Sequence, residues 1–375
     1  MKTKLVTLVI AGLIVSPTCY AINIYQDDEN SVSLRGYLRL TMYGDEDNEE
    51  ITDSGSRWGF DLTRKIQGDW TAGITMEWAT NFEKNKNLTI GGDSSLPSGD
   101  AGDSLSSRLG YLNFTHKNWG SIGIGKQWSV YYDVVGVTDV LNYFGGNATG
   151  VYNLGTDGGL SGTGRSEQAL TWRNSYKNLS VGIQIQAQDE AVTIQGTGSS
   201  DIDGTEIAVM GNGIAGMVSY DWGNFTLGAA FSKSKIDISP VFGNLGVEDE
   251  EDSISALALT YGTNGEGLYM GLTAASSEYH ETDNTNSYID AVGSELYVKY
   301  TLDNQVGIYG GFNLLESDES QNDFEMFYNY AGVEIPFING VGITFLEVKL
   351  NDNTNHDNTD GIDDTEVAIG VTIFI

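Results

Sequence analysis

Residues 32–42 read VSLRGYLRLTM, and this stretch decides the fold. Its even positions carry the apolar residues Val32, Leu34, Leu38, Leu40 and Met42, whereas its odd positions carry Ser33, Arg35, Tyr37, Arg39 and Thr41. A period of two residues is that of a β-strand, whose side chains alternate between two faces. The stretch therefore predicts a strand with one apolar face and one polar, basic face.

The same alternation recurs along the chain, and no helical period is sustained. It predicts sixteen strands at about 31–43, 56–65, 70–80, 107–116, 119–128, 165–174, 179–188, 213–222, 225–235, 253–262, 267–279, 290–301, 305–316, 323–335, 341–350 and 365–375. Short turns alternate with long polar loops at 44–55, 82–106, 189–212, 236–252 and 351–364. This pattern is typical of an antiparallel β-barrel that spans an outer membrane, where a closed sheet pairs every backbone group.

Aromatic residues at the short turns separate this interpretation from its rival, a secreted all-β protein that stays in water. Those that flank the turns are Trp70, Trp119, Tyr176, Trp222, Phe225 and Phe337. Membrane barrels place such rings at the level of the lipid headgroups. The sequence therefore favours the membrane barrel, which is an all-β fold.

The N-terminus indicates export. A basic start is followed by an apolar stretch over 5–15 and by small residues before position 22, so we expect a signal peptide over 1–21 and a mature barrel over 22–375. The stretch is too short for a spanning helix, which needs about 20 apolar residues. A lipid anchor at Cys19 is the alternative, although Ser16-Pro17-Thr18 is a poor lipidation sequence. The expected location is the cell outer membrane.

Composition excludes several other functions. The formal charge of −33 excludes a general electrostatic interaction with nucleic acid, and a single cysteine excludes a disulfide scaffold. The glycine pattern at 211–216 leads into a strand, so it does not predict a dinucleotide site, and His116, His280 and His356 form no cluster. We therefore expect no enzyme and no cofactor. Loose binding of Ca²⁺ or Mg²⁺ between the acidic loops and lipopolysaccharide is a secondary hypothesis.

Three motifs resemble a known family. Residues 56–60 read SRWGF, 107–111 read SRLGY, and 123–146 read GIGKQWSVYYDVVGVTDVLNYFGG. They are similar to the general diffusion porins of Gram-negative outer membranes, and the third resembles their fifth strand and third loop. The resemblance implies a homotrimer of sixteen-stranded barrels. In each barrel, a third loop at about 129–164 would fold inward and narrow a water-filled pore.

Parity and resemblance together predict a basic wall in this pore. Charged residues on a lipid face cost about 2–4 kcal/mol near the midplane, so alternation is expected to turn Arg35 and Arg39 inward. Arg57 and Arg108 also alternate with apolar neighbours, so they are expected on the opposite face of their strands. The resemblance matches Arg57, Arg108 and Arg165 to the basic residues of the porin constriction and Asp139 to an acid on the facing loop. Arg165 could instead hold a neighbouring subunit.

Other residues receive supporting roles. Lys126 shares the parity of its apolar neighbours, so we expect it at the subunit interface, and Asp133 is expected to brace the third loop. Gly145 and Gly146 would let that loop approach the wall where a Cβ would clash. Porins of this type commonly read Pro-Glu before Phe-Gly-Gly, whereas this chain has Asn142 and Tyr143. An aromatic ring therefore replaces one constriction carboxylate.

The expected function is a passive channel for small hydrophilic solutes and ions, with modest cation selectivity. The alternative is an oligosaccharide-selective porin in which Tyr143, Trp128 and other aromatics form a sliding surface. An outer-membrane hydrolase would need a Ser–His pair that the sequence gives no reason to bring together.

Overall fold

The computed structural model describes residues 21–45, 48–81, 105–153, 156–194, 204–241, 246–283, 287–317, 324–337, 340–353 and 364–375. The predicted signal peptide, except for its last residue, and His356 lie outside these ranges. No helix in the described ranges is long and apolar enough to cross a membrane.

Most of the described chain is β-strand. The first half contains β1 (Ile22–Gln26), β2 (Asn30–Gly44), β3 (Glu49–Asp53), β4 (Arg57–Lys65), β5 (Trp70–Thr80), β6 (Leu105–His116), β7 (Gly120–Trp128), helix α1 (Tyr132–Val135), β8 (Arg165–Tyr176), β9 (Leu179–Gln186) and β10 (Glu190–Thr193). The second half contains β11 (Glu206–Trp222), β12 (Phe225–Ile238), β13 (Val247–Thr263), β14 (Glu266–Thr282), β15 (Tyr288–Thr301), β16 (Gly307–Ser317), β17 (Glu325–Phe337), β18 (Gly342–Asn351) and β19 (Thr365–Phe374).

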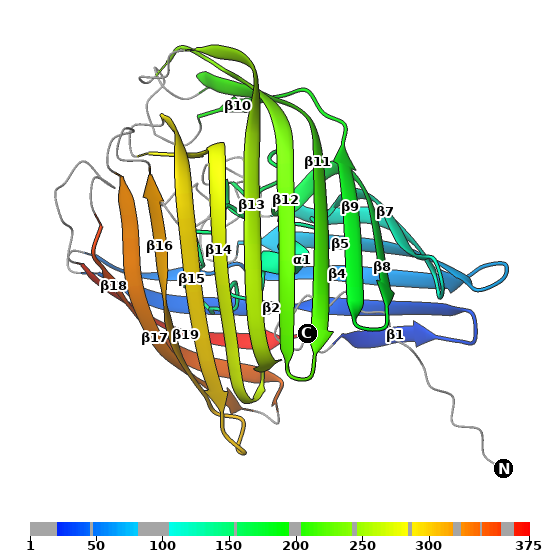
Figure 1. Ribbon diagram of the computed structural model, residues 1–375. Helices are drawn as coiled ribbons and strands as arrows, with labels where there is room; N and C mark the ends of the chain where they lie inside the picture. Colours follow the sequence, from blue (N-terminus) through cyan, green and yellow to red (C-terminus); the bar gives the residue numbers. More distant parts are fainter. Residues whose placement is uncertain are drawn as a thin grey trace.

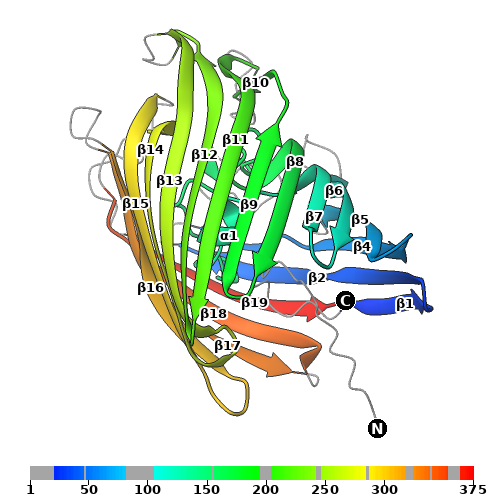
Figure 2. The ribbon, with the colours of Figure 1, turned by 45° about the vertical axis from the view of Figure 1, so that its right-hand side comes forward.

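Sixteen of these strands form a closed antiparallel ring. Strand β2 pairs with β4, the order continues through β9, β11 pairs with β9, and the remaining strands follow in sequence to β19. Strand β19 then pairs with β2, from Val367 opposite Gly44 to Phe374 opposite Tyr37. Figures 1 and 2 show the strands curving around one interior, with β2 and β19 side by side. The predicted all-β fold with sixteen strands is confirmed.

The other three strands extend this ring. Strand β1 pairs with the beginning of β2, on the edge that β19 occupies further along, and the Ile375 N–H donates to the Gly36 carbonyl at 2.9 Å. Strands β3 and β10 lie where polar loops 44–55 and 189–212 were predicted, and β12 and β13 extend into the predicted loop 236–252. Those loop boundaries are wrong. Beyond the apolar band, the outer face carries polar residues, and apolar residues such as Ile236 and Ile238 are buried on the inner side instead.

The two faces of the ring differ as the alternation predicts. Leu38, Leu40 and Met42 of β2 are 40–52 % exposed on the outer face, whereas Arg39 and Thr41 between them are buried. Rings at the short-turn end are also exposed, with Trp119 at 68 % and Tyr176 at 71 %. The outer face therefore carries the apolar band, and polar side chains face the interior.

The connection between β7 and β8 packs against the inner face of the ring. Its helix α1 lies against β11, β12 and β13, within the ring of strands (Figure 1). The Tyr269 hydroxyl of β14 donates to the Val137 carbonyl at 2.8 Å, and further along the connection Asn142 reaches Glu347 of β18. Residues 129–164, here called the pore loop, thus contact strands on the far side of the ring from β7 and β8.

Candidate pore constriction

Four arginines lie along one part of the ring: Arg35 and Arg57 on the paired strands β2 and β4, Arg108 on β6 and Arg165 on β8. An acid between them, Glu77 of β5, lies 2.9 Å from Arg108 Nε and 3.5 Å from Arg35 Nη2. Glu77 also interacts electrostatically with Arg57. Arg35 Nε also lies 3.2 Å from Asp61 Oδ2. Arg35, Arg57 and Arg108 thus surround Glu77, and Arg165 interacts electrostatically with Arg57. The four arginines and Glu77 are here called the basic wall.

Glu77 was missed by the sequence reasoning, although a signal was present. It follows Met76, which is 43 % exposed on the outer face, so its parity turns it inward. It lies opposite Gly59 of β4 and Leu109 of β6. These two neighbouring strands are the ones that carry Arg57 and Arg108. An acid at an inward position between two arginine-bearing strands predicts an ion pair.

Arg57 keeps an unused donor. Its guanidinium lies 4.5 Å from the ring centroid of Tyr37 and also donates to the Tyr37 hydroxyl. The buried Nε atom has no hydrogen-bond partner among the described residues. Buried donors are normally satisfied, so this N–H is an exception within the basic wall.

Arg165 lies where the pore loop returns to the wall. Its Nε is 3.2 Å from Asp157, and Lys126 Nζ is 2.8 Å from the same carboxylate and 2.7 Å from Glu167. Burial alone would raise the pKa of Asp157, but Arg165 and Lys126 hold it below its usual range. These residues, together with Arg108, line a cavity of about 100 Å³. Both ion pairs of Lys126 are within its own chain, and its place at a subunit interface stays a prediction.

Asp139 is held on the pore loop by two tyrosines. Its Oδ2 accepts from the hydroxyls of Tyr132 at 2.7 Å and Tyr152 at 2.6 Å. Burial and the Asp139 charge raise the pKa of Tyr152, so its hydroxyl remains a donor. The Arg165 guanidinium lies 5.9 Å from the ring centroid of Tyr152. Tyr152 therefore lies against both the loop acid Asp139 and Arg165 of the basic wall.

Two carboxylates of the far wall bind the backbone of the pore loop. Glu347 of β18 accepts from the amides of Asn142 at 2.6 Å, Tyr143 at 2.9 Å and Phe144 at 3.1 Å. Glu295 of β15 accepts from the Ala148 amide at 2.9 Å. Sequence reasoning missed both glutamates, although each is the only acidic residue at an inward position of its strand. They bind the loop, which fixes its path across the interior.

The predicted bracing residues lie at further contacts between loop and wall. Asp133 Oδ2 accepts from Arg173 Nε of β8 at 2.5 Å. The Tyr328 hydroxyl donates to the Gly145 carbonyl at 2.5 Å, and a Cβ added at Gly146 would lie 2.5 Å from Glu295 Oε2. Contacts of this kind are what the predicted bracing requires.

Arg39 and Tyr143 lie against the pore loop itself. Arg39 is 6 % exposed, its Nε donates to Thr372 Oγ1 at 2.9 Å, and its guanidinium donates to the Asn142 carbonyl. The ring of Tyr143 stacks on Tyr43 with centroids 5.4 Å apart. Neither belongs to the basic wall, and a direct role for either in contact with solutes stays a prediction.

Comparison with known proteins now decides the family. The chain matches the Gram-negative porins over residues 9–372. It belongs to that family. The porin OmpD of Salmonella typhimurium is 26 % identical over 302 residues, which cover 80 % of this chain and 74 % of OmpD. Outer membrane porin N of Escherichia coli is 26 % identical over 305 residues, covering 78 % and 72 %.

Solved porin structures share the fold of this porin. Salmonella typhi OmpF, crystallised in complex with daunomycin, has a TM-score of 0.70 at 20 % identity, covering 94 % of this chain and 99 % of its own. An anion-selective porin from Comamonas acidovorans has a TM-score of 0.67 at 14 % identity, covering 92 % and 99 %. The trimer form of Vibrio cholerae OmpT has a TM-score of 0.63 at 16 % identity, covering 93 % and 100 %.

The family settles the general function. This porin is a diffusion channel of the outer membrane and not an enzyme. Its resemblance to general diffusion porins, predicted from three motifs, is confirmed. In the described part of the chain, no group of three His, Cys, Asp or Glu side chains is arranged to hold a metal ion.

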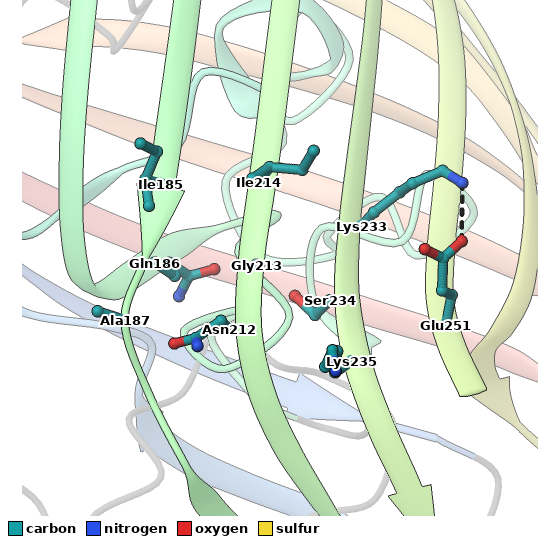
Figure 3. Close-up of a pocket in the computed structure, with 10 residues that line it drawn as sticks. All are labelled: Ile185, Gln186, Ala187, Asn212, Gly213, Ile214, Lys233, Ser234, Lys235 and Glu251. Atoms are coloured by element: carbon teal, nitrogen blue, oxygen red, sulfur yellow. Dashed lines mark hydrogen bonds and ion pairs between the residues drawn. The ribbon is translucent and has the colours of Figure 1, made fainter. Parts of the chain in front are cut away.

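A groove of about 380 Å³ lies outside the pore, across β9, β11, β12 and β13. Figure 3 shows Ile185, Ile214 and Lys233 on these strands, with Lys233 paired to Glu251 at 2.9 Å. Ile185 and Ile214 are 52 % and 53 % exposed, so this is the outer, apolar face of the porin. The groove lies where that face passes from isoleucine to charged residues, and it takes no part in the constriction.

Proposed function

We propose that this porin passes small hydrophilic solutes and ions passively, through a constriction between the basic wall and Asp139 of the pore loop. The observation that carries the proposal is the cluster of Arg35, Arg57 and Arg108 around Glu77, beside a loop tied to the opposite wall. Fixed charges of opposite sign across a narrow passage create a transverse field. Such a field orients dipolar solutes and disfavours large apolar ones.

We also propose a modest preference for cations. Asp and Glu outnumber Lys and Arg by 52 to 19 in the chain. Several of the acids, such as Asp237, Glu248 and Glu251, are exposed beyond the apolar band at the long-loop end of β12 and β13. They concentrate cations at the entrance, whereas the basic wall acts in the opposite direction. A similar fold occurs in an anion-selective porin, so the fold alone does not decide whether cations or anions are preferred. The charges on this chain must decide it.

The test is a set of reversal potentials in planar bilayers with a salt gradient. We expect Arg108→Gln to increase the preference for cations and Glu77→Gln to reduce it, because each removes one charge from the same wall. Lys117→Gln is the control, since Lys117 pairs with Asp69 and is 62 % exposed near the short turns. Unchanged reversal potentials in both wall variants would contradict the proposed constriction.

The trimer belongs to this proposal as well. The similar V. cholerae OmpT is described as a trimer, and we propose the same assembly for this chain, with its apolar band in contact with membrane lipid and lipopolysaccharide. Ca²⁺ or Mg²⁺ bridging of the acidic loops to lipopolysaccharide remains a hypothesis. Titration of these ions against loop-deleted protein tests it, and unchanged affinity would refute it.

The sugar-selective alternative has less support from the geometry. The Trp128 ring stacks on Tyr132 with centroids 4.1 Å apart, and Tyr143 stacks on Tyr43. One face of each ring is therefore already occupied within the protein. Current blockade by sugars at micromolar concentration would favour the alternative over free diffusion.

A further inference from the structure

A histidine that the constriction does not explain lies against the second half of the pore loop. His280 of β14 is 0 % exposed. Its Nδ1 is 2.6 Å from Asp252 Oδ1 of β13, and its Nε2 is 2.8 Å from the carbonyl oxygen of Gly150. The ring thus joins the barrel wall to the loop backbone.

The two partners of this ring restrict its protonation. A backbone carbonyl can only accept a hydrogen bond, and an ionised carboxylate can only accept one. A neutral imidazole has a single N–H, so it cannot donate to both. Both contacts are hydrogen bonds only when the His280–Asp252 pair holds an extra proton, either as imidazolium with carboxylate or as imidazole with carboxylic acid.

We propose that His280 is a positioning residue of the pore loop, and that its pair with Asp252 holds the loop at Gly150 only while this extra proton is bound. The inference rests on the proposed diffusion function, since it concerns the stability of the loop that narrows the channel. Loss of the proton leaves one lone pair of the ring facing an acceptor, either Gly150 or Asp252. Repulsion then replaces one of the two hydrogen bonds.

The surroundings favour the protonated pair. Glu281, the next residue on β14, favours the imidazolium when it is ionised, and Asp252 itself is 3 % exposed. The other titratable groups near the pair are hydroxyls: Tyr288 of β15, close to Asp252, and Tyr131 of the loop, close to Glu281. Within the described ranges, the only ion pair of Asp252 is the one with His280. Nothing there competes with the imidazolium for this carboxylate.

The loop is shaped to receive the ring. Gly150 has φ +64°, and a Cβ added there would lie 2.6 Å from His280 Nε2. Asn153 Nδ2 also donates to the His280 carbonyl at 2.9 Å, so the loop contacts both the side chain and the backbone of this residue. A side chain at position 150 would separate the carbonyl from the imidazole.

The sign of the effect follows from the proton count. After loss of the extra proton, the remaining N–H stays on Nδ1, because a lone pair there would meet stronger repulsion from the charged Asp252 carboxylate than a lone pair on Nε2 meets from the neutral Gly150 carbonyl. The hydrogen bond to Gly150 is therefore present while the proton is bound and is lost as the pH rises. Loss of a hydrogen bond that involves a charged group changes an equilibrium by a factor of about ten or above. Excursions of the loop away from the wall should become more frequent by that factor. Alkaline pH should therefore increase current fluctuations in an otherwise open channel.

Single-channel recording from pH 6 to pH 10 tests this inference. Wild-type porin should show a rise in fluctuation frequency with pH. His280→Gln should remove the pH dependence, because an amide N–H donates to Gly150 without titrating. Asp252→Asn should also remove it, because the Asn NH₂ group can donate to Nδ1, so that a neutral imidazole keeps its N–H on Nε2 for Gly150. His116→Gln, at the end of β6 and outside the pore loop, should behave as wild type.

The outcomes separate the two proposals. A wild-type channel whose fluctuations do not depend on pH, or a His280→Gln channel that keeps the wild-type dependence, would overturn the role of His280 and leave the diffusion function intact. Absence of any conductance in the wild type would overturn both. If His280→Gln fails to fold, Asp252→Asn still decides, and a pH dependence unchanged from the wild type would contradict the proposal.

Discussion

Glu347 shows at the scale of one residue how the pore loop is held. The side chain is 0 % exposed, and a buried carboxylate is costly unless its charge is satisfied. Three consecutive loop amides and the Tyr309 hydroxyl, at 2.7 Å, donate to its two oxygens. The charge of one wall residue thus orders three residues of the loop.

Replacing this carboxylate tests its role. Glu347→Gln leaves one acceptor oxygen and places an NH₂ group against loop N–H groups. We expect a loss of about 2–4 kcal/mol in the free energy of unfolding, from at least one lost charged hydrogen bond and one unsatisfied buried group. Thermal unfolding in detergent measures it, and channel noise should rise in parallel.

Glu278→Gln is the matched control. Glu278 is exposed on the outward side of β14, so its substitution should change the unfolding free energy by no more than about 0.5 kcal/mol. Equal effects of the two substitutions would contradict the anchoring role of Glu347.

Some site residues could be predicted from the sequence, and others could not. Parity predicts that Arg35 and Arg108 face inward, because the apolar band fixes the direction of their neighbours. The partners of Glu295 and Glu347 lie 147 and 205 positions away along the chain. Periodicity carries no information on how a loop lies against a distant strand, so those contacts required the structure.

Among the structural elements, the pore loop depends on small residues in the strands it crosses. Gly293 of β15 lies so close to the loop that an added Cβ would overlap the carbonyl of Ala148. The atoms that this Cβ would meet, the carbonyl oxygen and carbon of Ala148, belong to the loop backbone. The loop itself would therefore have to move. The approach of loop to wall is therefore set by this glycine.

Gly293→Ala should displace the loop. We expect a destabilisation of about 1–3 kcal/mol, as for overpacked sites, together with an altered single-channel conductance. Gly110→Ala is the control, because Gly110 also lies in a strand and an added Cβ there would meet no atom within 4 Å. A Gly293→Ala channel with wild-type stability and conductance would show that the loop does not lie against β15.

The return of the pore loop to β8 should depend on pH through Asp157. Its pKa is lowered in the folded protein, so its contribution to stability is present above the unfolded value near 4 and is lost as the pH falls through the folded value. We expect Asp157→Asn to lower the melting temperature at pH 7 and to have a smaller effect at pH 2. A melting temperature lowered equally at both pH values would contradict the ion pairs with Arg165 and Lys126.

At the scale of the whole molecule, the sequence predicts the number of strands in the barrel better than the points at which the strands end. Sixteen strands and a polar interior follow from alternation such as that of residues 32–42. The ends of β12 and β13 do not, because acids such as Asp237 and Glu251 read as loop although they lie in paired strands. Beyond the membrane the pattern is reversed, because Ile236 and Ile238 are buried in a cluster with Met210 whereas Lys235 and Asp237 are exposed.

The net charge of the molecule predicts how selectivity depends on salt. Exposed charges are screened over about 10 Å at 0.1 M salt and about 3 Å at 1 M. The preference for cations should therefore be clear at 0.1 M and weaken at 1 M. Reversal potentials at both concentrations measure this, and a preference for anions at low salt would contradict the role of the acidic rim.

The central claim is that this chain forms an open, passive channel across the outer membrane. The most direct measurement is the single-channel conductance of the purified, detergent-extracted protein in a planar bilayer, with and without sugars. The account predicts stepwise currents, proportional to voltage at moderate potentials, that grow with salt concentration and persist when sugars are added. A bilayer that shows no steps at any salt concentration, with folded protein present, would contradict it.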